Sequence, residues 1–268
     1  MTIAWLICQE PVHIGGADSS SRGNNNPIFR LPDRTPAIPG SSLRGALREH
    51  AESQEKYQPL VKNWFGGKED ISAGHIALGW GWTLWWPIHV LGYGNWWVSC
   101  LSWLNRFQQL SHQSPLNLDP NKVYITEEQL KDKTVYLRWL KLNNVQHCTD
   151  TLRLPKQIPK NRLIIVPDDS INIIVDMGLV RQPRVSLKNL DEIDQAAERQ
   201  ENPDENTSLV NNLFSVEGFP PGAVFLISWT SRGKVDNLEK WKNFLVDEHF
   251  LGGLWSVGYG RIQIYQIE

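Results

Sequence analysis

Residues 13–48 read HIGGADSSSRGNNNPIFRLPDRTPAIPGSSLRGALR, and this segment decides how the chain is organised. It predicts a strand end at His13 before two glycines, then a polar loop, then a turn at Pro36, Pro39 and Gly40. A helix is predicted directly after the turn, because apolar residues follow with helical spacing. A rigid scaffold commonly places functional groups at strand exits and loops of this kind.

The predicted helix start has the composition of an anion-binding site. Ser41 and Ser42 are good N-cap residues, and Arg44 and Arg48 lie four residues apart on another face of the helix. The free amides of a helix start attract anions, so the hydroxyls and guanidiniums beside them favour a phosphate-bearing partner. An ordinary capped surface helix with solvated arginines explains the same residues, and both interpretations stay open at this point.

Composition limits the classes of function. The chain has 268 residues, a formal net charge of −2 and three cysteines, at positions 8, 100 and 148. The length suits one elaborated domain or two small ones, and the balanced charge argues against a strongly basic nonspecific nucleic-acid binder. Any RNA contact must then come from a local basic face. The cysteines lack zinc spacing and leave an odd thiol, which fits a reducing cytoplasm, and no signal peptide is recognised.

Tryptophan is concentrated in the most apolar part of the chain, residues 77–98. Glycines, Pro87, His89 and Asn95 interrupt this part, so a membrane span is not expected and a buried core segment is predicted. Tryptophans can form stacking platforms for bases. At this density we interpret them as core and subunit-contact residues.

A coarse reading of the remaining chain predicts alternating strands and helices. Residues 2–8 have β-branched and aromatic content typical of a strand, and a helical region is predicted to end at residues 63–67, where two glycines fit a C-terminal cap. Further strands are predicted at 135–142, 162–166, 218–229 and from Arg261, and further helices at 126–132 and 237–248.

The chain ends with a glycine-rich segment, LGGLWSVGYGRIQIYQIE. Its glycines would let backbone amides approach a ligand phosphate, and Arg261 opens the last strand. No Gly-Lys-Ser/Thr follows, so this is not a Walker loop. The candidate phosphate-binding residues here, which the resemblance described next assigns to RNA binding, are Gly252, Gly253, Gly258, Gly260 and Arg261.

Taken together, these motifs resemble the RAMP superfamily of RNA-binding proteins found in CRISPR effector complexes. The resemblance rests on HIG, PIFR and PAIPGSSLRGALR near the N-terminus, on WFGG followed by SAGHIALGW, on LFSVEGFPPGAVF, and on the glycine-rich loop. Residues 87–107 are similar in type and order to a segment of the repeated backbone subunit of type III-B (Cmr) complexes. The likeness is weakest between about residues 108 and 160.

The resemblance implies an α+β fold: a ferredoxin-like or RRM-like antiparallel sheet with two helices on one face, elaborated by insertions. It implies a single domain, 1–268, with an inserted thumb hairpin at about 177–216. In this family the thumb reaches over the neighbouring subunit and interrupts the guide–target duplex. The implied partners are guide RNA, target RNA, copies of the chain and other subunits of a type III complex, in the cytoplasm and without a membrane.

Further site residues follow from the resemblance. The thumb segment contributes Arg181, Arg184 and Lys188 as candidate RNA contacts. Family members that cut target RNA carry an aspartate two residues before the proline of the PI-x-R segment, and this position is Asn25 here. An amide carries no negative charge and cannot act as a base near neutral pH. Asp18 is the alternative carboxylate, and His13 is the candidate general acid or base.

Three functions stay open from the sequence. The first is a binding and assembly role that requires no cofactor. The second is a metal-dependent endoribonuclease that cuts target RNA with magnesium or manganese, against which Asn25 argues. The third is a guide-processing nuclease that uses His13 without metal. The pattern of residues 87–107 disfavours the third, because it resembles the backbone group.

Overall fold

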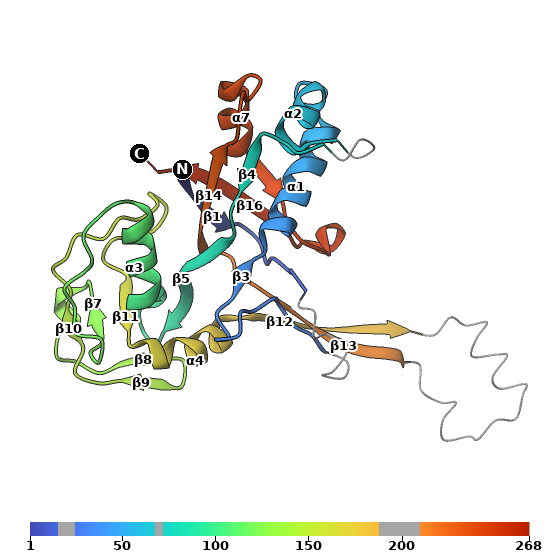
Figure 1. Cartoon of the computed structure of the whole chain (residues 1–268). Helices are drawn as coiled ribbons and strands as arrows, with labels where there is room; N and C mark the ends of the chain where they lie inside the picture. Colours follow the sequence, from blue (N-terminus) through green and yellow to red (C-terminus); the bar gives the residue numbers. More distant parts are fainter. Residues whose placement is uncertain (16–24, 68–71, 188–209, 268) are drawn as a thin grey trace, which may run out of the picture.

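The computed structural model describes residues 1–15, 25–67, 72–187 and 210–267. Asp18 and Lys188 lie outside these residues. The fold is α+β, with a large, mostly antiparallel sheet, several helices and a small second sheet (Figure 1). No helix within the described ranges is long and apolar enough to cross a membrane.

The centre of the large sheet is formed by strands from both ends of the chain. β1 (Thr2–Cys8) lies between β14 (Val224–Ser231) and β16 (Arg261–Gln266) and is antiparallel to both. Leu6 of β1 is opposite Phe225 on one side and Ile264 on the other. The last five residues of β1 are all buried, because elements cover both faces of the sheet there.

The sheet extends from this centre in both directions. β5 (Gly81–Val90) pairs with β14, and β6 (Gly94–Cys100) and β11 (Leu163–Val166) follow outward. The order in the main path is β10-β7-β11-β6-β5-β14-β1-β16-β15. The shorter strands are β3 (Ala37–Ile38), β4 (Ile76–Leu78), β7 (Tyr124–Ile125), β8 (Val135–Leu137), β9 (Leu140–Leu142), β10 (Gln146–His147) and β15 (Glu248–Phe250).

Five α-helices and three 3₁₀ turns are described. The helices are α1 (Gly40–Ser53), α2 (Val61–Phe65), α3 (Leu101–Leu110), α4 (Asp168–Gly178) and α7 (Leu238–Leu245). The 3₁₀ turns are η2 (Gln58–Leu60), η3 (Glu128–Leu130) and η4 (Trp255–Val257). The prediction that Ser41 or Ser42 caps α1 is wrong: the helix begins at Gly40 after Pro39, with no side-chain cap.

Two other expectations are corrected between residues 126 and 142. The predicted helix at 126–132 is only the 3₁₀ turn η3, and the predicted strand at 135–142 is a tight hairpin of β8 and β9. Arg138 has a φ of 53°, in the left-handed region, and this reversal splits the strand. The strands predicted at 2–8 and 162–166 and the helix at 237–248 are confirmed.

The tryptophan-rich core predicted from the sequence is present. Trp85 and Trp86 of β5 are fully buried, as are Trp64 of α2 and Trp241 of α7. The ring of Trp241 contacts Trp64 at 5.3 Å between centroids. The three cysteines are free and buried, and burial raises the pKa of the Cys100 thiol to about 12. They therefore pack as small apolar residues.

A second, three-stranded sheet projects from the body of the molecule (Figure 1). It consists of the antiparallel hairpin β12 (Val180–Leu187) and β13 (Val210–Gly218), with β2 (Asn25–Asn26) parallel to β13. The strand-like ends predicted for the segment 177–216 are therefore present. Residues 188–209, between the two strands, lie outside the described ranges.

A buried chain of hydrogen bonds links α1 to β15. His249 Nε2 lies 3.0 Å from the Phe244 carbonyl, which can only accept, so this nitrogen donates. His249 Nδ1 then accepts from His50 Nδ1 at 2.6 Å. Gln54 contacts the other ring nitrogen of His50 at 2.6 Å. This arrangement fits two neutral rings, because protonating His249 would place a second donor against the His50 N–H.

We expect Trp241→Ala to lower the free energy of unfolding by about 3–5 kcal/mol, since it removes a fully buried ring at the centre of an aromatic cluster. Thermal or urea denaturation measures the change. Trp139→Ala is the matched control, because Trp139 is 70% exposed and should change stability by less than about 1 kcal/mol. Equal losses in both variants would contradict the assignment of the core.

Stability should also fall in mild acid. Burial and the neighbouring His50 lower the pKa of His249 from 6.5 to about 4. Between these two pKa values the unfolded chain binds a proton that the native state does not, so the free energy of unfolding decreases as the pH falls. Urea denaturation at pH 7 and pH 5 should show this decrease, and His249→Gln should flatten it. An unchanged pH dependence in that variant would exclude His249 as the cause.

Candidate functional site

The segment that follows β1, residues 11–15, is held between two other parts of the chain. On one side Val12 forms an antiparallel bridge with Phe219, directly after β13. On the other side His13 forms one with Gly253 of the glycine-rich loop, and the Gly253 amide donates to the His13 carbonyl at 3.0 Å. We call this meeting point the hub; it comprises residues 11–15, 217–219 and 251–260.

The ring of His13 is fixed within the hub. It is 6% exposed, and its Nδ1 lies 2.7 Å from the Glu217 carbonyl oxygen. A carbonyl only accepts, so Nδ1 carries the proton and Nε2 keeps a lone pair. A Cβ atom at Gly15 would lie 3.6 Å from this Nε2 and 3.7 Å from Asn26 Oδ1. Gly15 therefore places no side chain between these two polar atoms.

Asn25, the position of the family's aspartate, belongs to β2 beside the hub. Its backbone pairs with Ser215 of β13, and that of Asn26 pairs with Val216. Gly15 bridges to Ile28 in the same region. The His13 segment, the strand that contains Asn25, the hairpin and the glycine-rich loop therefore meet in the structure.

The glycine-rich loop approaches the His13 segment closely. A Cβ atom at Gly252 would overlap the His13 carbonyl oxygen, and Gly252 has a φ of 81°. Gly258 and Gly260 also have positive φ, and the Gly260 amide donates to the Pro11 carbonyl at 2.8 Å. Arg261 is turned to acids at the sheet edge instead, with Glu10 at 3.2 Å and Glu248 at 3.6 Å.

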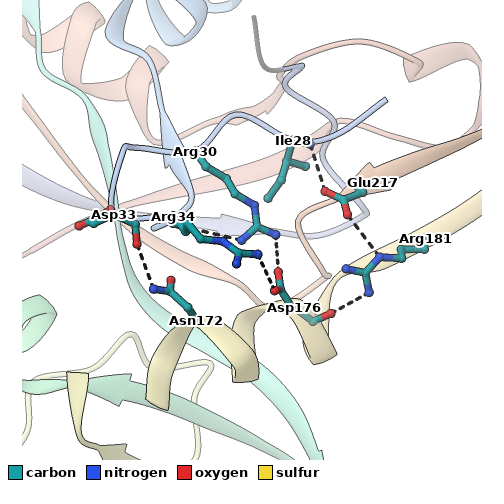
Figure 2. A network of polar contacts seen from close by, with 8 residues as sticks. All are labelled: Ile28, Arg30, Asp33, Arg34, Asn172, Asp176, Arg181 and Glu217. Carbon is teal, nitrogen blue, oxygen red and sulfur yellow. Dashed lines mark hydrogen bonds and ion pairs between the residues drawn. The ribbon is translucent and has the colours of Figure 1, made fainter. Parts of the chain in front are cut away.

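A network of ion pairs and hydrogen bonds fixes the base of the hairpin (Figure 2). Arg30 and Arg34 both bind the carboxylate of Asp176 on α4, at 2.6 Å and 3.0 Å. Arg181 of β12 donates to the Asp176 carbonyl at 2.8 Å and pairs with Glu217 at 3.3 Å. The second oxygen of Glu217 accepts from the Ile28 amide at 3.4 Å. We call this network the clasp; it joins the PIFR segment, α4 and both strands of the hairpin.

Arg184 connects the hairpin to the glycine-rich loop. Its guanidinium lies 5.8 Å from the ring centroid of Tyr259. The Tyr259 hydroxyl donates to Gln182 at 3.1 Å. Burial raises the pKa of this hydroxyl, which therefore stays protonated at neutral pH. The hairpin is thus fixed both to α4 and to the loop.

The residues predicted at the start of α1 are arranged differently from the expectation. Arg44 donates to the Phe65 carbonyl at the end of α2, and Arg48 pairs with Glu52 at 2.8 Å. The side chain of Arg48 is only 14% exposed. Both guanidiniums thus have partners within the protein, whereas Ser41 and Arg44 remain exposed at the surface. Neither arginine is simply solvated, and an anion site at the helix start stays a prediction.

The sequence patterns did not point to four charged residues of the clasp: Arg30, Arg34, Asp176 and Glu217. Arg30 lies in the PIFR motif, and that motif was the one available signal for it. Asp176 is 146 residues away from Arg30 in the sequence, so no local pattern connects them. Glu217 acts through both its carboxylate and its backbone carbonyl.

The polar side chains at and beside the hub are not suited to bind a divalent cation. Within the described ranges no group of three or more histidine, cysteine or carboxylate side chains is placed to hold a metal. Asp176 and Glu217 are both paired with arginines. His13 Nε2 and Asn26 Oδ1 leave a site of neutral acceptors, and a divalent cation of the magnesium type prefers carboxylate oxygens.

Several solved structures have a fold similar to that of this chain. The chain is similar to a subunit of the apo state of type III-B Cmr-beta, with a TM-score of 0.78 and 16% identity over 100% of this chain and 97% of that chain. The complex of Cmr-beta with cognate target RNA gives a TM-score of 0.78 at 15% identity, over 98% and 96% of the two chains. Oligomeric Cmr4 from Pyrococcus furiosus is similar with a TM-score of 0.69 and 20% identity, over 99% of this chain and 97% of that chain.

Comparison of the sequence with curated proteins and with family models gives one match. No curated protein sequence matches the chain significantly. The family model of the RAMP superfamily matches residues 5–263, from β1 to β16. The matched part contains the hub and the clasp. The chain therefore belongs to the RAMP superfamily.

Proposed function

We propose that the chain is a backbone subunit of a type III CRISPR effector complex that binds guide RNA and holds target RNA paired with it. The observation that carries the proposal is the hub, where the His13 segment, the glycine-rich loop and the base of a projecting hairpin meet. Similarity to Cmr structures, one bound to cognate target RNA and one oligomeric, supports RNA and further copies of the chain as partners.

The core is ferredoxin-like in this proposal. Strands β5, β14, β1 and β16 lie side by side in that order, and all three neighbouring pairs are antiparallel. α1 follows β1 and α7 follows β14 in the chain, as expected of a β-α-β-β-α-β unit. The ring of His50 on α1 lies 5.7 Å from Phe244 on α7, which supports both helices packing together.

The hairpin β12–β13 acts as the thumb of this single domain. It projects from the body, and the clasp fixes its base to α4 and to the PIFR segment (Figures 1 and 2). A thumb that separates segments of a duplex must resist bending, so a base joined by ion pairs suits this role. Arg34, with 65% of its side chain exposed, and Arg181, with 49%, offer guanidinium groups to a phosphate chain at this base.

The other RNA contacts come from backbone groups and from the surface of α1. Gly252 and Gly258 are exposed, so a phosphate can approach the backbone of the glycine-rich loop, although the amides of Gly253, Gly258 and Gly260 already donate to carbonyls. At the start of α1 the hydroxyls of Ser41 and Ser42 and the exposed Arg44 are retained as contacts. Arg48 and Arg261 contribute least, because each is paired with glutamate.

Target cleavage is the second candidate function, and one observation favours it. Among the described residues His13 Nε2 has no hydrogen-bond partner, and it lies next to Gly15, beside the strand that carries Asn25. A group of this kind can take a proton from an attacking hydroxyl. Asn25 supplies no charge, however, so binding without cutting is the primary proposal.

Deleting residues 188–209 and joining β12 to β13 with a short turn should leave a folded protein, because the clasp lies outside the deleted part. We expect wild-type protein to purify with short RNAs of uniform origin and to form regular multi-copy assemblies on RNA. The deletion variant should bind RNA without forming these assemblies, as seen by electron microscopy and light scattering. Regular assemblies formed by the deletion variant would exclude the hairpin as the thumb.

Asn25→Asp should create or raise metal-dependent cutting of a guide-matched RNA, since it restores a carboxylate at the position of the family's aspartate. Wild-type protein should bind this RNA with little cutting. Cleavage is measured with and without magnesium or manganese, and Asp18→Ala is the second variant. Wild-type cutting that disappears in Asp18→Ala would assign the role to Asp18. Wild-type cutting that survives in Asp18→Ala would point to His13 or to a neighbouring subunit.

A further inference from the structure

A row of flat side chains runs from the hub to α3. It begins at Phe29, whose amide donates to the Ile14 carbonyl at 2.6 Å. The ring of Phe29 lies 5.7 Å from that of Trp80, and Trp80 stacks on Trp82 at 6.0 Å with 21° between the planes. The guanidinium of Arg106 on α3 covers Trp82, 4.3 Å from its ring centroid. We call these four residues the stacking row.

The row is accessible, unlike the aromatic core. Trp80 is 38% exposed, and Trp82 and Arg106 are half-buried. Trp80 directly precedes β5 and Trp82 is the second residue of the strand, and their two rings are stacked. Trp85 and Trp86 therefore belong to the buried core expected from the sequence, whereas Trp80 and Trp82 lie at its accessible edge.

A cavity of about 580 Å³ opens where the row ends. Its described lining contains no carboxylate and comprises Met1, Trp82, Arg106, Gln109, Leu110 and His112. Within the described ranges Arg106 has no carboxylate partner, and its contact is the ring of Trp82. A cation kept on an aromatic face without an acid beside it leaves its outer face for another flat, polarisable group.

The C-terminal end of α3 lines the cavity and determines which part of a nucleotide the cavity can accept. Ser111 and His112 follow the last turn, and their backbone amides donate to the carbonyls of Phe107 and Gln109. The C-terminal end of a helix carries partial negative charge, which repels phosphate. The side chains of Gln109 and His112 instead offer hydrogen-bond groups to the polar edge of a base.

We propose that this cavity binds one unpaired nucleobase of single-stranded RNA, stacked on the Trp82–Arg106 pair. Bases stack on aromatic rings and on guanidinium planes with little sequence preference. The row starts in the segment that pairs with Ile14, so an RNA strand leaving the hub would reach the cavity along exposed rings. The site rests on the proposed RNA binding and adds a contact outside the hub.

The test measures affinity for single-stranded RNA and maps contacts with RNA that contains 4-thiouridine. Photo-crosslinks are expected in the peptides that carry Trp80, Trp82 or Arg106. Arg106→Gln should weaken binding about five-fold or more. Arg106→Lys should weaken it similarly, because an ammonium keeps the charge and loses the plane. Trp139→Leu is the matched control and should bind normally, since Trp139 is also an exposed tryptophan beside an arginine.

Each other outcome has a distinct meaning. Wild-type protein that binds no RNA would overturn the proposed function and this site together. Wild-type RNA binding with unchanged Arg106 variants and no crosslinks in these peptides would overturn the site alone. Full affinity in Arg106→Lys would show a simple charge contact and overturn the stacking proposal. Arg106 variants that lose self-association and keep RNA affinity would assign the surface to a contact between copies.

Discussion

The arrangement of this protein depends on a few backbone hydrogen bonds made by the five residues that follow β1. Val12 and Phe219 exchange hydrogen bonds of 3.1 Å and 2.8 Å, and His13 and Pro11 accept from the glycine-rich loop. These bonds join strand exits that lie more than 200 residues apart in the chain. Because His13 contributes its carbonyl to the loop and its ring to the hairpin, displacing this one residue would loosen both.

Arginine–carboxylate pairs give the hub its electrostatic character. Asp176 and Glu217 would repel a phosphate chain if they were free, but arginines neutralise both. Arg34 approaches Asp176 with 65% of its side chain still in solvent, so it can serve the clasp and a phosphate together. The clasp is only partly buried, and pairs of this kind contribute little stability each. Their value lies in fixing the direction of the hairpin, because three arginines from two segments of the chain meet acids from two other segments.

The sequence predicted the elements whose signals are local. β1, α7 and β11 have their own apolar pattern, and the motif residues of the hub could be placed by resemblance. The region 108–160 could not be resolved, since its strands have two or three residues and exist only by pairing with neighbours. The contacts of Arg44 and Arg48 within the protein could not be predicted for a similar reason. Arg44 donates to the Phe65 carbonyl because α1 packs beside the end of α2, and Arg48 pairs with Glu52 one turn further along α1. The composition of the segment does not reveal either contact.

Binding and cleavage make different demands on such a fold. The hub is built from backbone amides, carbonyls and glycines, and these groups remain when side chains change. This agrees with a TM-score of 0.78 at 16% identity, where the fold is kept with few residues in common. Metal-dependent cleavage instead calls for a charged group, and the family resemblance places the corresponding position at Asn25, which is held in the ladder by its backbone. Exchanging a carboxylate for an amide there leaves the backbone pairing intact, so a chain of this fold can hold RNA whether or not it cuts it.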